Sequence, residues 1–363
     1  MSTRIVILTA SSGGGHNAAA CALQTLIKDR LRGDCEFSVI DVYQKNLFQR
    51  LPVLAKIRYH SDSLWRVFLY LTNHKAIARS IARLMRPFMI RSIAKQLPEH
   101  SDYIIAVHFN PTQYLPQLAK LFSIPPKTAI VATDLDPHWA WFGCNADAMY
   151  VSSEAGHKKA LISGYQPHQI FTLSLIPTEK IAYRTPSNKS PSRKKLGIVS
   201  GQDGSNPRQI QDLLGTLADL PHATEMDVTV FCGTNTNLHN RLTNDIDLYA
   251  PLSLDVQGYT DNLKSHFHHY DLMLIRTSPG ILSECICAGV PVIGFDWSAH
   301  EQYQQQFIQM HDIGFASKAI TELRTYVYQL LTQPQILLDL QKNVSRLRRQ
   351  NDTNAMLTHL LKI

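Results

Sequence analysis

Short runs of β-branched and apolar residues alternate with helix-like stretches along the 363-residue chain. This alternation is typical of parallel sheets covered by helices, because each helix returns the chain to the edge where the next strand begins. We therefore expect an α/β fold. The predicted strands cover residues 4–10, 37–42, 103–107, 128–133 and 148–151 in the first half and 196–200, 228–233, 271–275 and 290–295 in the second.

Residues 184–195 separate the two series of strands and are rich in proline, serine and basic residues. Such a composition is typical of a linker between domains. We predict an N-terminal domain over 1–183 and a C-terminal domain over 196–363, with the last helix of the chain able to pack back on the N-terminal domain.

The chain carries 36 Lys and Arg against 29 Asp and Glu, a formal charge of +7. This excess favours anionic partners such as nucleotides or acidic lipids, with nucleic acid as a third class. The six cysteines show neither Cys-x-x-Cys nor zinc-like spacing, so we expect reduced thiols, a cytoplasmic protein and no bound metal. No apolar run reaches the roughly 18 residues of a membrane-spanning helix, and the N-terminal run is too short for a signal peptide.

Three glycines, 13–15, join the first predicted strand to a helix predicted from Asn17, and His16 follows them directly. Glycine permits positive φ and lets a ligand approach the backbone closely, and the N–H groups that begin a helix favour an anion. The spacing matches neither the G-x-G-x-x-G fingerprint nor a P-loop. Phosphate binding and a simple packing turn both stay open from this stretch alone.

Residues 45–95 contain eleven Lys or Arg and one acidic residue, Asp62, interleaved with apolar and aromatic residues. A basic stripe beside an apolar face is what a helix on an anionic bilayer requires, so we predict a membrane-binding segment here. A solvated helix face is the alternative, and no nucleic-acid motif accompanies the segment. Four of the basic residues recur at helical spacing: Lys75, Arg79, Arg83 and Arg86.

Polar side chains with proton-transfer chemistry follow the strand predicted at 128–133. They are Asp134, Asp136 and His138, with Trp139 directly after them. The carboxyl end of a parallel strand is where α/β sheets bind ligands. Carboxylates and an imidazole can move protons, and an indole can stack on a sugar. A packed Asx turn is the alternative.

Two further strand–glycine–helix turns occur in the second half, at 201–204 and 278–280. Both can present backbone N–H groups to phosphate, with Ser278 near the N-cap of the second helix. Glu284 lies one turn into this helix, predicted over 281–288, where a carboxylate can accept hydrogen bonds from ribose hydroxyls. The arrangement suits a nucleoside diphosphate.

Five motifs, taken in order, resemble the lipid glycosyltransferases that include processive diacylglycerol glucosyltransferases and plant monogalactosyldiacylglycerol synthases. The peptidoglycan transferase that adds N-acetylglucosamine to a lipid-linked acceptor is similar more distantly. The resemblance covers nearly the full length. The motifs are Ser12-Gly13-Gly14-Gly15-His16-x-x-Ala19-Ala20, Thr133-Asp134-x-x-x-His138-Trp139, Cys232-Gly233-Thr234-Asn235, Gly258-Tyr259-Thr260-Asp261-Asn262-Leu263 and Pro279-Gly280-x-x-x-Glu284-x5-Val290-Pro291.

The resemblance implies a GT-B fold, in which two Rossmann-like domains face each other across a cleft. It implies that the N-terminal domain takes diacylglycerol as a peripheral protein on the cytoplasmic face of a membrane. The C-terminal domain would hold UDP-glucose or UDP-galactose as the donor. Transfer would invert the anomeric carbon and need neither a metal nor another cofactor.

The resemblance and side-chain chemistry together suggest roles. His16 is expected nearest the acceptor hydroxyl, as general base or as a donor to the diphosphate, while Asp134 and His138 shape the acceptor side or share the proton transfer. Arg276 and the N–H groups around Gly280 would neutralise the leaving UDP, and Glu284 would hold the ribose. The other predicted donor-binding residues are Gly14, Gly15, Gly201, Ser278 and Pro279, with Tyr259, Thr260 and Leu263 beside the uracil and Glu301 and Gln302 at the sugar hydroxyls.

The sequence departs from the family pattern where Gln202 and Ser278 replace usual glycines and Gln304 replaces a usual asparagine. These departures leave the donor sugar open. They are also the one argument for a protein of a different class, a UDP-sugar-binding regulator without turnover. A transferase acting on a polyprenyl-linked acceptor is the alternative enzyme. A sugar-nucleotide epimerase would share the fold but would not need the basic segment 45–95.

Overall fold

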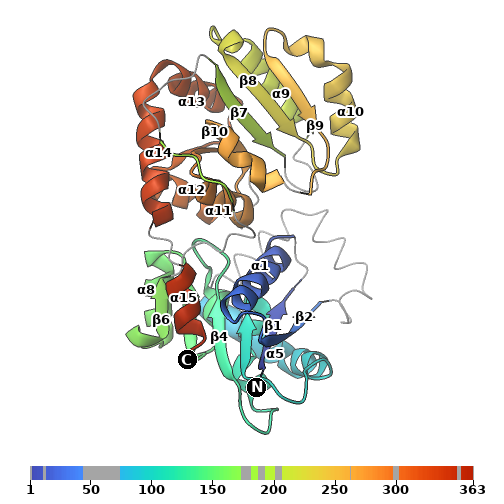
Figure 1. Ribbon diagram of the computed structural model, residues 1–363, viewed down its shortest axis with the longest axis vertical. Helices are drawn as coiled ribbons and strands as arrows, with labels where there is room; N and C mark the ends of the chain where they lie inside the picture. Colours follow the sequence, from blue (N-terminus) through green and yellow to red (C-terminus); the bar gives the residue numbers. More distant parts are fainter. Residues whose placement is uncertain are drawn as a thin grey trace. The chain divides into compact units, whose positions relative to one another are not determined.

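The computed structural model describes residues 2–10, 14–43, 74–172, 181–186, 193–200, 207–261, 263–296, 302–349 and 353–362. The chain forms two compact units. The first comprises Met1–Thr178 together with Asn351–Ile363, and the second comprises Glu179–Gln350. Each unit is built on one six-stranded sheet (Figure 1).

The sheet of the first unit is parallel throughout. Its order is β2-β1-β3-β4-β5-β6, so the strand order reverses between β1 and β3. The crevice outside the carboxyl ends of strands at such a reversal is where open α/β sheets bind ligands. The strands are β1 (Thr3–Thr9), β2 (Cys35–Asp41), β3 (Tyr103–Ala106), β4 (Lys127–Val131), β5 (Ala148–Val151) and β6 (Ile170–Thr172).

Helices cover both faces of this sheet. Val6 and Leu8 of β1 pack in the same cluster as Met89 and Ile93 of α5 (Lys75–Ala94). Alternate residues of β1 pack in a second cluster with α1 (Gly14–Arg30), as expected when successive side chains point to opposite faces. The other helices in the described part of this unit are α6 (Phe109–Thr112), α7 (Leu115–Ala119) and α8 (Glu154–Ser163), with 3-10 turns η1 (Trp139–Phe142) and η2 (Pro167–Gln169).

The last helix of the chain, α15 (Thr353–Leu360), packs on the first unit beside α1 (Figure 1). Leu357 and Leu360 are buried in the cluster that α1 shares with the sheet. The Tyr150 hydroxyl lies 2.7 Å from Nδ1 of His359, and burial lowers the pKa of this histidine. Apolar burial and this hydrogen bond together hold the C-terminal helix on the N-terminal sheet.

The second unit repeats the architecture with a parallel sheet of order β12-β11-β10-β7-β8-β9. The strand order reverses here between β7 and β10. Its strands are β7 (Lys194–Val199), β8 (Met226–Phe231), β9 (Ser253–Gln257), β10 (Leu272–Arg276), β11 (Val292–Asp296) and β12 (Gly314–Ala316). Its helices are α9 (Pro207–Ala218), α10 (Thr236–Asn244), α11 (Pro279–Ala288), α12 (Gln302–Met310), α13 (Ile320–Thr332) and α14 (Pro334–Arg349), with 3-10 turns η3 (Ala223–Glu225), η4 (Ile246–Tyr249) and η5 (Leu263–His269).

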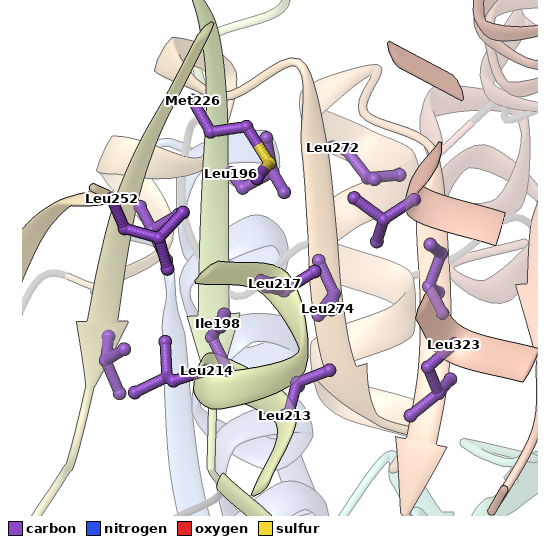
Figure 2. Close-up of a cluster of buried hydrophobic side chains, with 14 of the residues drawn as sticks. Leu196, Ile198, Leu213, Leu214, Leu217, Met226, Leu252, Leu272, Leu274 and Leu323 are labelled. Carbon is purple, nitrogen blue, oxygen red and sulfur yellow. The ribbon is translucent and has the colours of Figure 1, made fainter. Parts of the chain in front are cut away.

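The core of the second unit lies between α9 and the sheet. Figure 2 shows the leucines of α9 packed over β7 and β10. Leu213, Leu214 and Leu217 recur at the helical spacing that places them on one face, and all three are fully buried. This packing fixes α9 against β7 and β10, whose carboxyl ends lie where open α/β sheets bind ligands.

The predicted α/β fold class is confirmed, and the structure adds detail that the sequence patterns did not give. Helix α1 begins at Gly14 rather than at Asn17, so Gly14 and Gly15 are helical and do not serve as positive-φ positions. The packing of Leu23 and Ile27 on the sheet outweighs the helix-propensity penalty of about 1 kcal/mol for each glycine. The short strands β6, β9 and β12 were not predicted, because three to five residues of mixed polarity give little periodicity.

Candidate active site

His16 lies in the first turn of α1, at the carboxyl end of β1. Its Nδ1 is 3.2 Å from the carbonyl oxygen of Val107 and 2.9 Å from Oγ1 of Thr133. Because a carbonyl oxygen can only accept, Nδ1 carries the proton and donates to Val107, which leaves the lone pair of the neutral ring on Nε2. Residues that follow β3 and β4 therefore hold the imidazole in a tautomer that can take a proton at Nε2.

Aromatic and imidazole rings lie around His16. The ring of His108 is centred 4.4 Å from that of His16, and the ring of Trp141 is centred 6.3 Å away. Phe109 contacts the rings of His108 and His138, at 4.3 and 4.8 Å between centres. These rings give the sheet edge an apolar wall next to the imidazole that can act as a base.

Asp134 and His138 lie close to each other in the loop that follows β4. Oδ2 of Asp134 accepts a hydrogen bond of 2.7 Å from the indole N–H of Trp141, and Nε2 of His138 is 3.9 Å from the same oxygen. Nδ1 of His138 accepts the backbone N–H of Ala140 at 3.3 Å, so the neutral ring carries its proton on Nε2. In this tautomer the Nε2–H group of His138 faces the Asp134 carboxylate. Their attraction stabilises the conformation of the loop.

A partly buried ion pair fixes the same loop to α8. Nζ of Lys159 lies 2.9 Å from Oδ1 of Asp136 and also donates to the carbonyl oxygen of Pro137 at 3.0 Å. Both charged side chains are 18% exposed. The loop that carries Asp134 and His138 is therefore anchored at its middle.

The second unit presents the start of α11 at the reversal of its own sheet. Arg276 ends β10, and Ser278 is the N-cap of α11, followed by Pro279 and Gly280. Within the described part of the chain, the Ser278 hydroxyl makes no capping bond to its own helix. The first N–H groups of α11 can thus meet an anion. Gly294 of β11 supports this turn, because a Cβ there would lie 2.3 Å from Cγ2 of Thr277.

Several of the other predicted donor-binding residues lie in α11, or in a segment that leads into an element packed against it. Glu284 is half-buried in α11. Tyr259 and Thr260 precede Leu263, the first residue of η5, and η5 packs against α11. Tyr259 is 63% exposed, and its hydrogen bond with the Asp261 carboxylate raises the pKa of its phenol.

Helix α12 adds a residue that the sequence argument treated only as a departure. Gln302 begins the helix, and Gln304 is 2% exposed with a buried Oε1 that has no hydrogen-bond partner among the described residues. An unsatisfied buried carbonyl oxygen is costly, and a ligand hydroxyl is one kind of donor that would satisfy it. Gly201, Glu301 and positions 45–73 of the basic segment lie outside the described residues.

The sequence argument missed His108 and the contact of Thr133 with His16. His108 directly follows the strand predicted at 103–107, and Thr133 is the last residue of the strand predicted at 128–133. The rule that selected Asp134, a polar residue after the carboxyl end of a strand, would have selected His108 as well. The contact between Thr133 and His16 spans 117 positions and needed the sheet order to be known.

Comparison with known sequences finds similarity to glycosyltransferases that act on diacylglycerol. The sequence model of the monogalactosyldiacylglycerol (MGDG) synthase family matches residues 16–175. A probable MGDG synthase of Nicotiana tabacum is 27% identical over 82% of the chain, and a processive diacylglycerol β-glucosyltransferase of Bacillus licheniformis is 24% identical over 99% of it. The chain spans 59% of the length of the tobacco protein and 94% of that of the bacterial one.

Comparison with solved structures gives the fold. MurG of Acinetobacter baumannii superimposes with a TM-score of 0.61 and 15% identity, covering 99% of this chain and 100% of that one. A glycosyltransferase of kitacinnamycin superimposes with a TM-score of 0.64 and 10% identity, covering 100% and 99%. The two parallel six-stranded sheets and these neighbours confirm the predicted GT-B fold with two Rossmann-like domains.

The similarity in sequence extends well beyond the N-terminal match, and the fold agrees with it. Over most of its length the chain is similar in sequence to monogalactosyldiacylglycerol synthases and to processive diacylglycerol glucosyltransferases, and its fold is that of the GT-B glycosyltransferases.

Proposed function

We propose that the protein transfers a hexose from UDP-glucose or UDP-galactose to diacylglycerol, or to a glycosyl-diacylglycerol, at an anionic membrane surface. The observation that carries the proposal is His16, held by the Val107 carbonyl so that Nε2 can accept a proton. The relatives support it, because their names specify transfer to diacylglycerol. A structural neighbour with the same fold, HepE of Anabaena, was solved in complex with UDP.

In the proposed reaction, the acceptor hydroxyl approaches Nε2 of His16 and gives up its proton as its oxygen attacks the anomeric carbon. The bond from that carbon to the UDP oxygen breaks on the opposite side, which inverts the configuration. Arg276 and the first N–H groups of α11 stabilise the negative charge that develops on the leaving diphosphate. Gln304 accepts a hydrogen bond from a donor hydroxyl.

The test uses purified protein, diacylglycerol liposomes and a panel of radiolabelled UDP-sugars, with the lipid products separated by chromatography. We expect a labelled glycolipid from one UDP-hexose, with its anomeric configuration opposite to that of the donor. A product formed only with a polyprenyl-linked acceptor would contradict the lipid assignment. UDP binding without any product would identify a regulator instead.

Helix α5 supports action at a membrane surface. Met89 and Ile93 are buried against the sheet, while Leu84 and Phe88 are 74% and 67% exposed one turn apart on the outward side. Exposed large apolar side chains beside arginines suit an interface between lipid headgroups and acyl chains. The exposed arginines of this helix are Arg79, Arg83, Arg86 and Arg91. None of the described helices is long and apolar enough to cross a membrane.

Replacing Arg79, Arg83 and Arg86 together with glutamate is expected to release the protein from anionic vesicles. Each arginine near such a surface contributes about 1 kcal/mol, and binding should fall with salt because screening acts beyond roughly 8 Å. Vesicle cosedimentation measures the effect, while UDP affinity should not change. The matched control replaces Arg241, Arg324 and Arg346, exposed on the second unit, with glutamate. Equal vesicle binding by the two triple variants would contradict a membrane role for α5.

Gly280→Ala tests the contact between the diphosphate and α11. Among the described residues, no atom lies within 4 Å of the position that a Cβ would take, so the fold should accept alanine. We expect UDP affinity to fall roughly tenfold, about 1.4 kcal/mol, because the methyl group occupies space that the phosphates need. Gly215→Ala is the control. Gly215 lies in the middle of α9, a Cβ there also meets no described atom within 4 Å, and alanine raises the helix propensity of that position as well. If calorimetry gave equal UDP affinities for the two variants, the phosphates would not bind at the start of α11.

A further inference from the structure

His108 lies beside His16 and is fully buried, with 0% of its surface exposed. It lies two residues after the end of β3, where the strand order of the first sheet reverses between β1 and β3. A buried imidazole must have its polar atoms satisfied, so its surroundings define its orientation.

Three contacts fix the His108 ring. Its Nδ1 accepts the backbone N–H of Asn110 at 3.0 Å and caps α6. Phe109 stacks on it at 4.3 Å between ring centres, and Tyr43 meets it edge-on at 5.9 Å. A ring flip would break the cap, so neutral His108 keeps its proton on Nε2.

The His16 ring packs on this fixed ring at an interplanar angle of 70°. Residue 107 supplies the carbonyl that holds Nδ1 of His16, and residue 108 supplies the ring that packs on it. Both constraints come from one short backbone segment at the end of β3. Rotation of the His16 ring by 180° would lose the Val107 hydrogen bond and turn Nε2 away from its present direction.

We propose that His108 is a positioning residue, whose buried ring holds the His16 imidazole with Nδ1 on Val107 and Nε2 directed toward the acceptor. The kinetic part of this proposal rests on the proposed transferase function. In this proposal His108 acts through His16 and touches no substrate. A test must therefore show that the effect of His108 depends on His16.

Two substitutions separate the ring from the cap. His108→Asn keeps an oxygen that can accept the Asn110 N–H but removes the ring, and we expect it to lower kcat about 10- to 100-fold with little change in KM. His108→Phe keeps a ring but removes the cap acceptor, and we expect a smaller loss of kcat. The reverse order of the two losses would mean that the cap is what matters, and would overturn the proposal.

A double-mutant cycle shows whether His108 acts through His16. In a His16→Ala background we expect His108→Asn to change the remaining rate less than about threefold. The same 10- to 100-fold loss in both backgrounds would overturn the proposal. A wild-type protein without transfer would instead contradict the proposed function.

Nuclear magnetic resonance of histidine-¹⁵N-labelled protein tests the positioning without any turnover. The His16 resonances, assigned by their loss in His16→Ala, should show a protonated Nδ1 and an unprotonated Nε2 in the wild type. In His108→Asn the two nitrogens should move toward values averaged over both tautomers. An unchanged His16 pattern in His108→Asn would overturn the proposal.

Discussion

His16→Ala is expected to lower kcat by about 10²–10⁴-fold, the usual contribution of a positioned general base. The acceptor alcohol must lose its proton as it attacks, and the Val107 hydrogen bond to Nδ1 leaves the lone pair of the neutral His16 ring on Nε2. UDP affinity should stay within a few-fold, because the residues predicted to bind the nucleotide lie mainly in the second unit. Steady-state kinetics with diacylglycerol liposomes and calorimetry with UDP measure the two quantities.

Amide variants distinguish the two roles predicted for His16. In His16→Asn the amide nitrogen can take the place of Nδ1 and donate to Val107, but nothing replaces the base. In His16→Gln the amide reaches the position of Nε2 and can donate to a phosphate without removing a proton. Activity restored by glutamine would make His16 a phosphate ligand, and the base would then have to be sought at Asp134 or His138. Wild-type rates in all three His16 variants would show that the turn between β1 and α1 serves only packing.

Thr133→Val is the matched control for the orientation of His16. It removes the hydroxyl 2.9 Å from Nδ1 but keeps the volume of the side chain and the Val107 carbonyl. We expect a loss of kcat well below that of His16→Ala, because one of the two oxygen contacts of Nδ1 persists. Equal losses would mean that orientation accounts for the whole effect of His16.

Glu284→Ala is expected to weaken UDP binding by roughly 1–3 kcal/mol, the usual cost of losing hydrogen bonds to a charged group. Glu284 lies half-buried in α11, one turn beyond the N–H groups predicted to meet the diphosphate. The 3-10 turn η5, which follows the segment predicted to lie beside the uracil, packs against α11. Calorimetry with UDP measures the loss.

Glu284→Gln keeps an accepting oxygen and removes the charge. We expect it to retain more UDP affinity than Glu284→Ala, and both variants should unfold at a temperature close to that of the wild type. Normal UDP affinity in a folded Glu284→Ala protein would show that the ribose lies elsewhere. A large drop in thermal stability would instead assign Glu284 to the support of α11.

The sequence alone was enough to predict the α/β fold, nine strands and the edges where ligands should bind. These follow from local properties: β-branched runs, helical spacing and turns after strands. It was also enough to predict which residue types gather at the carboxyl ends of β1, β4 and β10, because parallel strands bring their ends to a common edge. The resemblance to the lipid glycosyltransferases was also visible in the sequence, because five motifs occur in order along the chain.

Tertiary structure decided which of these residues meet. It joined His16 to Val107 and Thr133, which are 91 and 117 positions away, and it packed His108 against the same ring. It directed His138 toward Asp134, and it buried Met89 of α5 while exposing Leu84 and Phe88. Strand order and side-chain packing set these contacts, and both depend on interactions between distant segments, which no local pattern of residues records.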